Sequence, residues 1–251
     1  MIIRKSPEEI DRMRRAGRIV AETIERTVAA VRPGIQTAEL DAVSEKTILE
    51  AGATPSFKGY RGFPASLCVS INEQVVHGIP GKRVLKPGDL LSLDFGAIWE
   101  GYHADAAVSL FVGGEAPSSE AEKLVRVTEE ALESGIAQIR VGGRLTDISH
   151  AVQQVVEGAG FNLVREYTGH GVGRALHEDP QIFNYGAPGR GPELRPGLVI
   201  AVEPMAMLGD WPTRVLADNW TVVTDDGSLA AHFEHTIAVT EDGPEVLTAP
   251  A

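Results

Sequence analysis

A strand-like pattern that occurs twice limits the folds that this chain can adopt. The segment from Lys86 to Asp94 reads as a base, a Pro-Gly turn, an apolar run and a carboxylate, and the same order returns 109 residues later, from Arg195 to Glu203. Aspartate and glutamate are unfavourable in buried strands, and an unpaired buried carboxylate is costly. Two copies of this feature predict one site that is built by two related halves, with a cation between the carboxylates.

The helices predicted around these strands repeat as well. Apolar residues recur at helical spacing from Ile10 to Val31, after an N-cap serine and a Pro-Glu-Glu start, and a second helix is predicted from Thr37 to Ala51. A helix from Glu120 to about Arg140 and another from Thr146 to about Glu157 follow the same plan in the second part of the chain. The order of elements is therefore duplicated together with the strand.

Glycines at the helix ends support the duplication. Gly34 and Gly142, like Gly52 and Gly160, lie 108 residues apart. We therefore expect a single domain over residues 1–251, made of two αα-β-β halves at approximately 1–113 and 120–251 that are related by a pseudo-two-fold axis. Ligand sites favour interfaces of this kind.

A hairpin is predicted to carry two of the acids. Asp94 lies in the apolar run Leu90–Ile98 and Asp105 in the run Tyr102–Val112, with Trp99-Glu100-Gly101 between them. A two-residue turn would place both carboxylates on one face of the hairpin, because side chains alternate along a strand, whereas a three-residue turn would place them on opposite faces. The sequence leaves both turns open.

A third strand, Ala231–Thr240, is expected to carry another acid. It alternates His232, Glu234 and Thr236 on one face with Phe233, His235 and Ile237 on the other. Each acid taken alone could be an edge-strand carboxylate that faces water. Four such acids, two of them in related strands, favour a shared site.

The histidines narrow the chemistry of this site. His170 and His177 lie seven residues apart in a Gly-rich stretch that permits close backbone approach, and His77 is a third candidate. The stretch could also be a flexible loop or a phosphate-binding loop, although it follows no dinucleotide-binding fingerprint. The remaining histidines singled out as ordinary core or surface residues are His103, His150 and His235.

At these positions the chain resembles the methionine aminopeptidases, which have the pita-bread metallopeptidase fold. The resemblance covers essentially the whole chain and is to the short bacterial type I form. It rests on Asp94, Asp105, Gly169-His170-Gly171, His177-Glu178-x-Pro180, Glu203-Pro204 and Glu234-His235-Thr236, with His77-Gly78-Ile79-Pro80 and Asp218-x-Trp220-Thr221. It implies an α/β (α+β) fold in which two αα-β-β halves surround a central curved antiparallel sheet.

The resemblance also implies a dinuclear metal site. Its ligands would be Asp94, Asp105, His170, Glu203 and Glu234, with Asp105 and Glu234 bridging the ions. Four carboxylates balance the charge of two divalent ions, and hard oxygens with one nitrogen suit Co, Mn, Fe or Zn. Two such ions can share and activate a water.

The catalytic and substrate-binding residues follow from the same resemblance. Glu203 would also transfer a proton, His177 would donate a hydrogen bond to the developing oxyanion, and His77 would contact the amide nitrogen on the leaving side. The methionine pocket would be formed by Phe57, Tyr60, Phe63, Cys68 and Trp220. The family more often has Cys, Tyr and Gln at the positions of Phe57, Phe63 and His232.

Composition bears on location and partners. A net charge of −12 argues against sequence-independent nucleic-acid binding, and we expect no specific nucleic-acid partner. Residues 1–20 carry a local excess of bases, which favours a solvated helix face; the alternative is a patch that docks transiently on the ribosome. The single cysteine fits a reducing compartment, and neither a secretory signal nor a membrane-length apolar run is present. We expect a cytoplasmic monomer that does not bind membranes.

The predicted function is metal-dependent removal of the initiator methionine from nascent proteins whose second residue is small. One alternative is a dipeptidase like prolidase or aminopeptidase P, although those relatives usually carry a separate N-terminal domain. Another is a pita-bread binding module that has lost catalysis, although such modules lack ligands that are all present here.

Overall fold

The computed structural model describes residues 1–250, which contain four α-helices and fifteen strands. The helices are α1 (Pro7–Ala30), α2 (Thr37–Glu50), α3 (Ser119–Ile136) and α4 (Leu145–Gly158), with a short 3₁₀ helix at Tyr60–Gly62. The strands are β1 (Thr54–Pro55), β2 (Leu67–Ile71), β3 (Gln74–Val76), β4 (Leu90–Trp99), β5 (Tyr102–Phe111), β6 (Asn162–Leu163), β7 (Gly169–Gly171), β8 (Glu178–Ile182), β9 (Val199–Val202), β10 (Met205–Met207), β11 (Thr213–Val215), β12 (Val222–Thr224), β13 (Ala230–His232), β14 (His235–Thr240) and β15 (Gly243–Val246). The four predicted helices are confirmed.

Equivalent contacts begin the second helix of each half. The backbone N–H of Gln36 donates to the carboxylate of Glu39 at the start of α2, and the backbone N–H of Arg144 donates to the carboxylate of Asp147 at the start of α4. Both hydrogen bonds are 2.9 Å long. A carboxylate at this position satisfies a free N–H group and interacts favourably with the helix dipole. The duplication seen in the sequence therefore extends to the capping of the helices.

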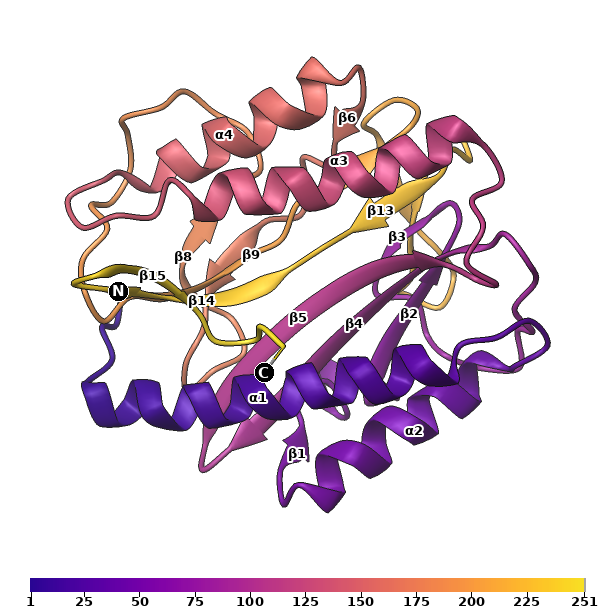
Figure 1. The fold of residues 1–251 in the computed structure, drawn as a ribbon, viewed down its shortest axis with the longest axis horizontal. Helices are drawn as coiled ribbons and strands as arrows, with labels where there is room; N and C mark the ends of the chain where they lie inside the picture. Colours follow the sequence, from indigo (N-terminus) through magenta and orange to yellow (C-terminus); the bar gives the residue numbers. More distant parts are fainter. Residues whose placement is uncertain (251) are drawn as a thin grey trace.

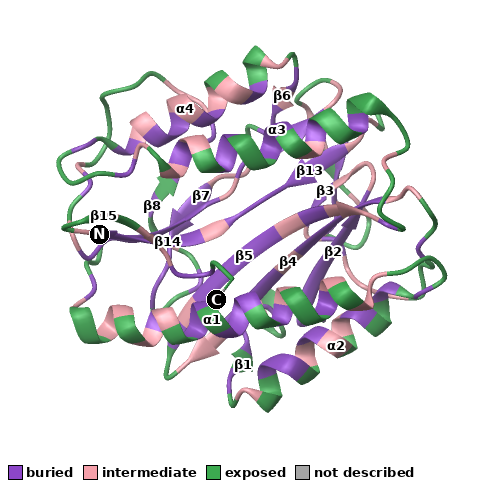
Figure 2. Ribbon diagram, in the orientation of Figure 1, coloured by how far each residue is buried: buried purple, intermediate pink, exposed green. Residues whose placement is uncertain are grey.

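The two helix pairs lie on opposite sides of the strands in the view of Figure 1, with α1 and α2 below and α3 and α4 above. Helices α1 and α2 contribute to one large apolar cluster with β2, β4 and β5, whereas α3 and α4 pack over β9, β13 and their neighbours. Figure 2 shows that the strands between the pairs are mostly buried and that exposed residues gather on the outer helix faces. No helix of residues 1–250 has the length and apolar character needed to cross a membrane.

All paired strands are antiparallel, in four sheets with the orders β1-β4-β2 (with β5 on β4), β13-β10-β6, β11-β12-β3 and β15-β14-β9-β7-β8. A bridge between Ala107 and Glu234 joins the first sheet to the last. The pita-bread fold, with its two related halves, is therefore confirmed.

The strand predicted at Ala231–Thr240 is wrong in one respect. The segment forms two strands, β13 and β14, with Phe233 and Glu234 between them. The break occurs because the chain changes partner here, from β10 to β9. Glu234 therefore lies at the junction of two sheets, where it can approach residues of both halves.

Candidate metal centre

The predicted site residues line one cavity of about 270 Å³. Its walls include all twelve, which are Phe57, Tyr60, Phe63, Cys68, His77, Asp94, Asp105, His170, His177, Glu203, Trp220 and Glu234. Three further wall residues, Arg61, Tyr167 and Leu176, were not predicted from the sequence. The structure thus brings the acids, the histidines and the aromatic residues together in space.

The β4–β5 hairpin places its two acids on the same face. Trp99 pairs with Tyr102 across a two-residue turn, so that Asp105 lies opposite Gly96, two residues from Asp94. Both turn residues, Glu100 and Gly101, have positive φ, as the favoured two-residue hairpin turns require. Of the two turns that the sequence left open, the shorter one is present, and both carboxylates face the cavity.

The other three candidate ligands come from the second half. His170 pairs with Ala201, and Ala201 also pairs with Thr236 on the next strand. Because side chains alternate along a strand, Glu203 and Glu234 project from the same side as His170. The ligand atoms of Asp105, His170 and Glu234 all lie within 4.8 Å of one another.

The ring of His170 is oriented toward the carboxylates. Its Nδ1 lies 2.9 Å from the Gly171 carbonyl oxygen, to which it donates, and this bond leaves the Nε2 lone pair free. Nε2 lies 3.5 Å from Asp105 Oδ2 and 3.6 Å from Glu203 Oε1. A backbone hydrogen bond of this kind orients metal-binding histidines and fixes their tautomer.

Burial makes this concentration of charge unfavourable without a cation. It raises the pKa of Asp94, Glu203 and Glu234 well above the usual range, and the neighbouring carboxylates add to the effect. Burial raises the pKa of Asp105 to about 6, against a hydrogen bond from Thr236. Burial also lowers the pKa of His170 to about 4, which favours a neutral imidazole. Divalent cations would relieve the repulsion and hold the carboxylates ionised.

Among the candidate ligands, one buried oxygen has no hydrogen-bond partner within the described residues. Asp94 Oδ1 is buried and accepts no hydrogen bond there. Buried polar atoms are nearly always paired, and such an exception commonly marks a missing water or ion. The oxygen-rich donor set, the neutral imidazole nitrogen and this free oxygen fit divalent metal ions.

The sequence pattern of metallopeptidase family M24 matches residues 11–241 of the chain. The chain belongs to metallopeptidase family M24. This M24 peptidase is similar to methionine aminopeptidase 1 of Bacillus subtilis, with 56% identity over 248 residues and 99% of each chain covered. It is also similar to the crystal structure of methionine aminopeptidase from Thermotoga maritima, with a TM-score of 0.96, 48% identity and 99% of each chain covered. The prolidase from Pyrococcus furiosus shares the fold, with a TM-score of 0.81 at 22% identity, and this chain covers 66% of it.

Two histidines of this M24 peptidase lie beside the carboxylate cluster. His177 Nδ1 lies 2.8 Å from the Tyr60 hydroxyl, so that Nε2 remains free, and its ring centroid is 4.3 Å from that of His170. His77 has a φ of 60°, a left-handed conformation that is uncommon for a residue with a side chain. Burial lowers the pKa of His77 and of His177 to about 4. Both imidazoles are therefore neutral at pH 7.

The remaining wall of the cavity is apolar. Phe57, Phe63, Cys68 and Leu176 form a buried cluster against which Tyr60 and Trp220 pack. Cys68 lies opposite Asp94 in the pairing of β2 with β4, which explains why a cysteine faces the candidate ligands. Gly96 is required here, because a Cβ would come 2.7 Å from the ring of Phe57. Burial raises the pKa of Cys68, so that this thiol forms a wall of the cavity and is a poor nucleophile.

Several supporting residues were missed or undervalued by the sequence analysis. Thr236 Oγ1 lies 3.0 Å from Asp105 Oδ1 and accepts from the backbone N–H of Asp105, and Asn184 donates to the backbone oxygen of Glu203. The strand alternation could have identified Thr236, since it shares a face with Glu234. No local signal marks Asn184 or Tyr167, because their positions depend on contacts between distant segments.

A buried ion pair holds the segment that carries His177. Lys5 Nζ lies 2.7 Å from Glu178 Oε2, and the two side chains are 2% and 8% exposed. Glu178 follows His177 directly, and its other oxygen accepts from the backbone N–H of Ala175. The chain segment before α1 therefore anchors the start of β8 beside the cavity.

Replacing Lys5 with methionine should destabilise the protein by about 3–5 kcal/mol, because it leaves the Glu178 carboxylate buried without its partner. Urea unfolding would measure this. Lys46→Met is the matched control, since Lys46 and Glu50 are 3.8 Å apart and mostly exposed and should contribute at most about 1 kcal/mol. Equal effects of the two substitutions would contradict the prediction.

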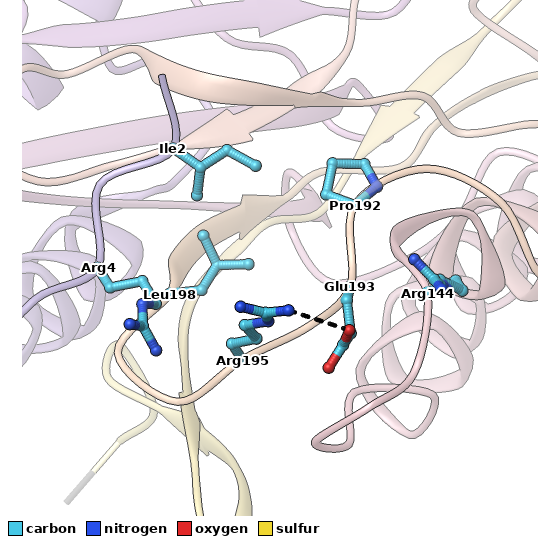
Figure 3. Close-up of a pocket in the computed structure, with 7 residues that line it drawn as sticks. All are labelled: Ile2, Arg4, Arg144, Pro192, Glu193, Arg195 and Leu198. Carbon is cyan, nitrogen blue, oxygen red and sulfur yellow. Dashed lines mark hydrogen bonds and ion pairs between the residues drawn. The ribbon is translucent and has the colours of Figure 1, made fainter.

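A second hollow, of about 360 Å³, has the opposite chemistry. It is lined by Ile2, Arg4, Arg144, Pro192, Glu193, Arg195 and Leu198. Figure 3 shows Arg195 directed toward Glu193, with which it forms an ion pair of 3.3 Å. Three guanidinium groups and one paired carboxylate cannot hold a divalent cation. This hollow is therefore separate from the metal centre.

Proposed function

We infer that this M24 peptidase is a metal-dependent aminopeptidase of the bacterial type I kind that removes N-terminal methionine. The observation that carries this conclusion is that one cavity is lined both by the acid and histidine cluster and by a cluster of apolar side chains. The similarity to methionine aminopeptidases extends over the whole chain.

We propose that Asp94, Asp105, His170, Glu203 and Glu234 hold two divalent ions, drawn from Co, Mn, Fe or Zn. Four carboxylates from two halves of the fold match the charge of two such ions, and the buried oxygen of Asp94 is free to bind one. When bound, two divalent ions can generate a nucleophile from water at neutral pH and polarise a scissile carbonyl.

The other catalytic roles would belong to side chains of this protein. Glu203 would accept a proton, and its position in the wall of the cavity, with Oε1 3.6 Å from His170 Nε2, supports this role. The free Nε2 of His177 can donate to the oxyanion, because Tyr60 holds the other ring nitrogen. His77 lines the same cavity and can contact the leaving amide nitrogen.

The apolar wall supplies the selectivity for methionine. Phe57, Phe63, Cys68 and Trp220, together with Tyr60, present apolar and sulfur-containing surface to a flexible thioether side chain. A cavity of about 270 Å³ also favours a small second residue, because a bulky side chain would have to fit beside His77 and His177. Cleavage of chain ends alone would follow if the free α-amine of the substrate binds at the metal site.

Replacing His177 with alanine should lower kcat by about 10²–10³-fold, the usual cost of removing one oxyanion donor. The KM for a Met-Ala-Ser peptide should change much less, because the methionine pocket is retained. Steady-state kinetics at saturating metal would test this. Tyr60→Phe is the control, since it removes only the partner of Nδ1 and should have a smaller effect on kcat than His177→Ala. A variant with nearly wild-type kcat would remove His177 from the mechanism.

Cleavage of Met-Ala-Ser compared with Gly-Pro and Xaa-Pro peptides tests the substrate class. Faster cleavage of the proline peptides would replace this proposal with a function like that of prolidase. A protein that binds no divalent ion and hydrolyses no peptide would instead be a binding module. Metal analysis before and after chelation separates these outcomes.

We further propose that residues 1–251 act as one catalytic domain, as a cytoplasmic monomer. The shared ligand set supports a single domain, because Asp94 and Asp105 come from one half and His170, Glu203 and Glu234 from the other. We also propose transient docking on the ribosome through the bases of α1. Arg12 and Arg14 are already paired with Glu100 and Glu245, so this contact has to rely mainly on bases such as Arg18, which forms no ion pair within residues 1–250.

A further inference from the structure

A buried imidazole beside Glu203 has a nitrogen without a partner. His232 is 2% exposed, and its Nε2 forms no hydrogen bond within residues 1–250. The carboxylate oxygen Oε2 of Glu203 lies 3.8 Å away. A buried polar atom that is left unsatisfied destabilises the folded state, and so its presence requires an explanation.

Hydrogen bonds to the backbone of His232 fix the position of this residue in the sheet. The Ser109 hydroxyl accepts from the His232 N–H at 2.9 Å and donates to the His232 carbonyl at 2.8 Å. His232 also pairs with Met205, two residues after Glu203, in the ladder of β10 and β13. Its location beside Glu203 is therefore built into the sheet.

Glu203 lies between two imidazoles. Oε1 is 3.6 Å from His170 Nε2, and Oε2 is 3.8 Å from His232 Nε2. The two rings differ in their hydrogen bonds, because His170 donates through Nδ1 to Gly171 and presents a lone pair from Nε2. His232 has no competing partner for Nε2, so this nitrogen can carry the proton and donate it toward Glu203.

We propose that His232 is a positioning residue that donates from Nε2 to Glu203 and so strengthens the affinity of the cluster for divalent metal. The inference rests on the proposed function, because it takes Glu203 as a ligand. Nε2 of His232 and Oε2 of Glu203 are 3.8 Å apart, whereas a normal hydrogen bond is about 2.9 Å long. Rotation about a side-chain torsion can close this difference. An ionised Glu203, as a ligand must be, is the stronger acceptor and favours the closer contact.

Another neutral donor could serve at this position. Glutamine carries an amide N–H₂ that can reach about the same place as the histidine Nε2. The two side chains share a donor, although they differ in shape. Partners of this kind typically change metal affinity by 10–100-fold when they are removed.

Three substitutions test the role of the donor. His232→Gln keeps a donor at the position of Nε2, His232→Asn moves the amide to the position of Nδ1, and His232→Leu removes the polar group. Titration calorimetry with Mn²⁺ and with Co²⁺ on metal-free protein would give the affinities, and the visible spectrum of bound Co²⁺ would report the ligand field. Thermal unfolding of each metal-free variant would confirm that it is folded.

We expect the Leu and Asn variants to bind both metals about 10–100-fold more weakly, and the Gln variant to bind within about threefold of wild type. Unchanged affinity in the Leu and Asn variants would overturn the inference and leave the proposed function intact. A Gln variant as weak as the Leu variant, with an altered Co²⁺ spectrum, would also overturn it, because His232 would then bind metal directly. A wild-type protein that binds neither ion would instead overturn the proposed function.

Discussion

Replacing Asp105 with asparagine should reduce turnover of a Met-Ala-Ser peptide by at least about 10³-fold, as the loss of one member of a catalytic unit does. Asp105 lies at the centre of the cluster, within 4.8 Å of ligand atoms of both His170 and Glu234. The asparagine side chain has almost the same shape, but it carries no negative charge and offers only one oxygen. The defect should therefore be in metal binding and chemistry, with the fold retained.

The controls separate charge from position. Glu203→Ala should be as inactive as Asp105→Asn, because it removes both a candidate ligand and the candidate proton acceptor. Glu122→Gln removes one acid from the exposed surface of α3 and should leave kcat and KM unchanged. Near-wild-type kcat in Asp105→Asn, measured with metal content determined in parallel, would contradict the assignment of Asp105 as a ligand.

Short-range patterns were enough to predict much of the centre. The number of residues in the turn between β4 and β5 limited Asp94 and Asp105 to two arrangements, on the same face or on opposite faces. The structure contains the arrangement with both acids on one face. The duplicated strand identified Glu203 as the counterpart of Asp94. The match is not complete in detail, since Asp94 lies in the middle of β4 whereas Glu203 follows the end of β9.

Short-range sequence patterns could not predict the interactions between distant segments. The buried pair of Lys5 and Glu178 joins residues 173 positions apart, and in the sequence Lys5 was only one of the bases gathered in residues 1–20. The break at Glu234 results from a change of strand partner, which is determined by the arrangement of β9 and β10 and leaves no signal in the local alternation. Local periodicity specifies which face of a strand a residue occupies, but the partner of that face is set by the assembled fold.

In metal-free protein at pH 7, Asp105→Asn should make the folded state more stable, whereas in the presence of divalent metal it should make it less stable. In metal-free protein, burial raises the pKa of Asp105 from 3.8 to about 6, so that the folded state binds more protons than the unfolded state between these values. The free energy of unfolding contributed by this group therefore falls as pH rises from about 4 to about 6, and stays low at pH 7. Asparagine lacks this penalty, and the metal-free variant should gain on the order of 3 kcal/mol over wild type across that interval.

Comparison of the two proteins isolates this group. The pKa of several buried histidines, among them His170 and His232, is lowered by burial, and these residues make the free energy of unfolding rise with pH over part of the same range. Because both proteins contain these histidines, their contribution largely cancels in the difference. The loss of the Asp105 charge also lowers the pKa of Glu203 and Glu234, which adds to the gain of the variant.

Divalent metal should change the sign of the difference at pH 7. A ligand present at 1,000 times its Kd stabilises the folded state by about 4 kcal/mol, and only wild type retains the complete set of ligands. Urea unfolding of both proteins at pH 4.5, 5.5 and 7, in EDTA and in Mn²⁺, would measure the effect. We expect the variant to be the more stable protein at pH 7 in EDTA and the less stable one in Mn²⁺. A difference that is independent of pH in EDTA would contradict the raised pKa of Asp105, and a difference that is the same in both solutions would contradict its role as a metal ligand.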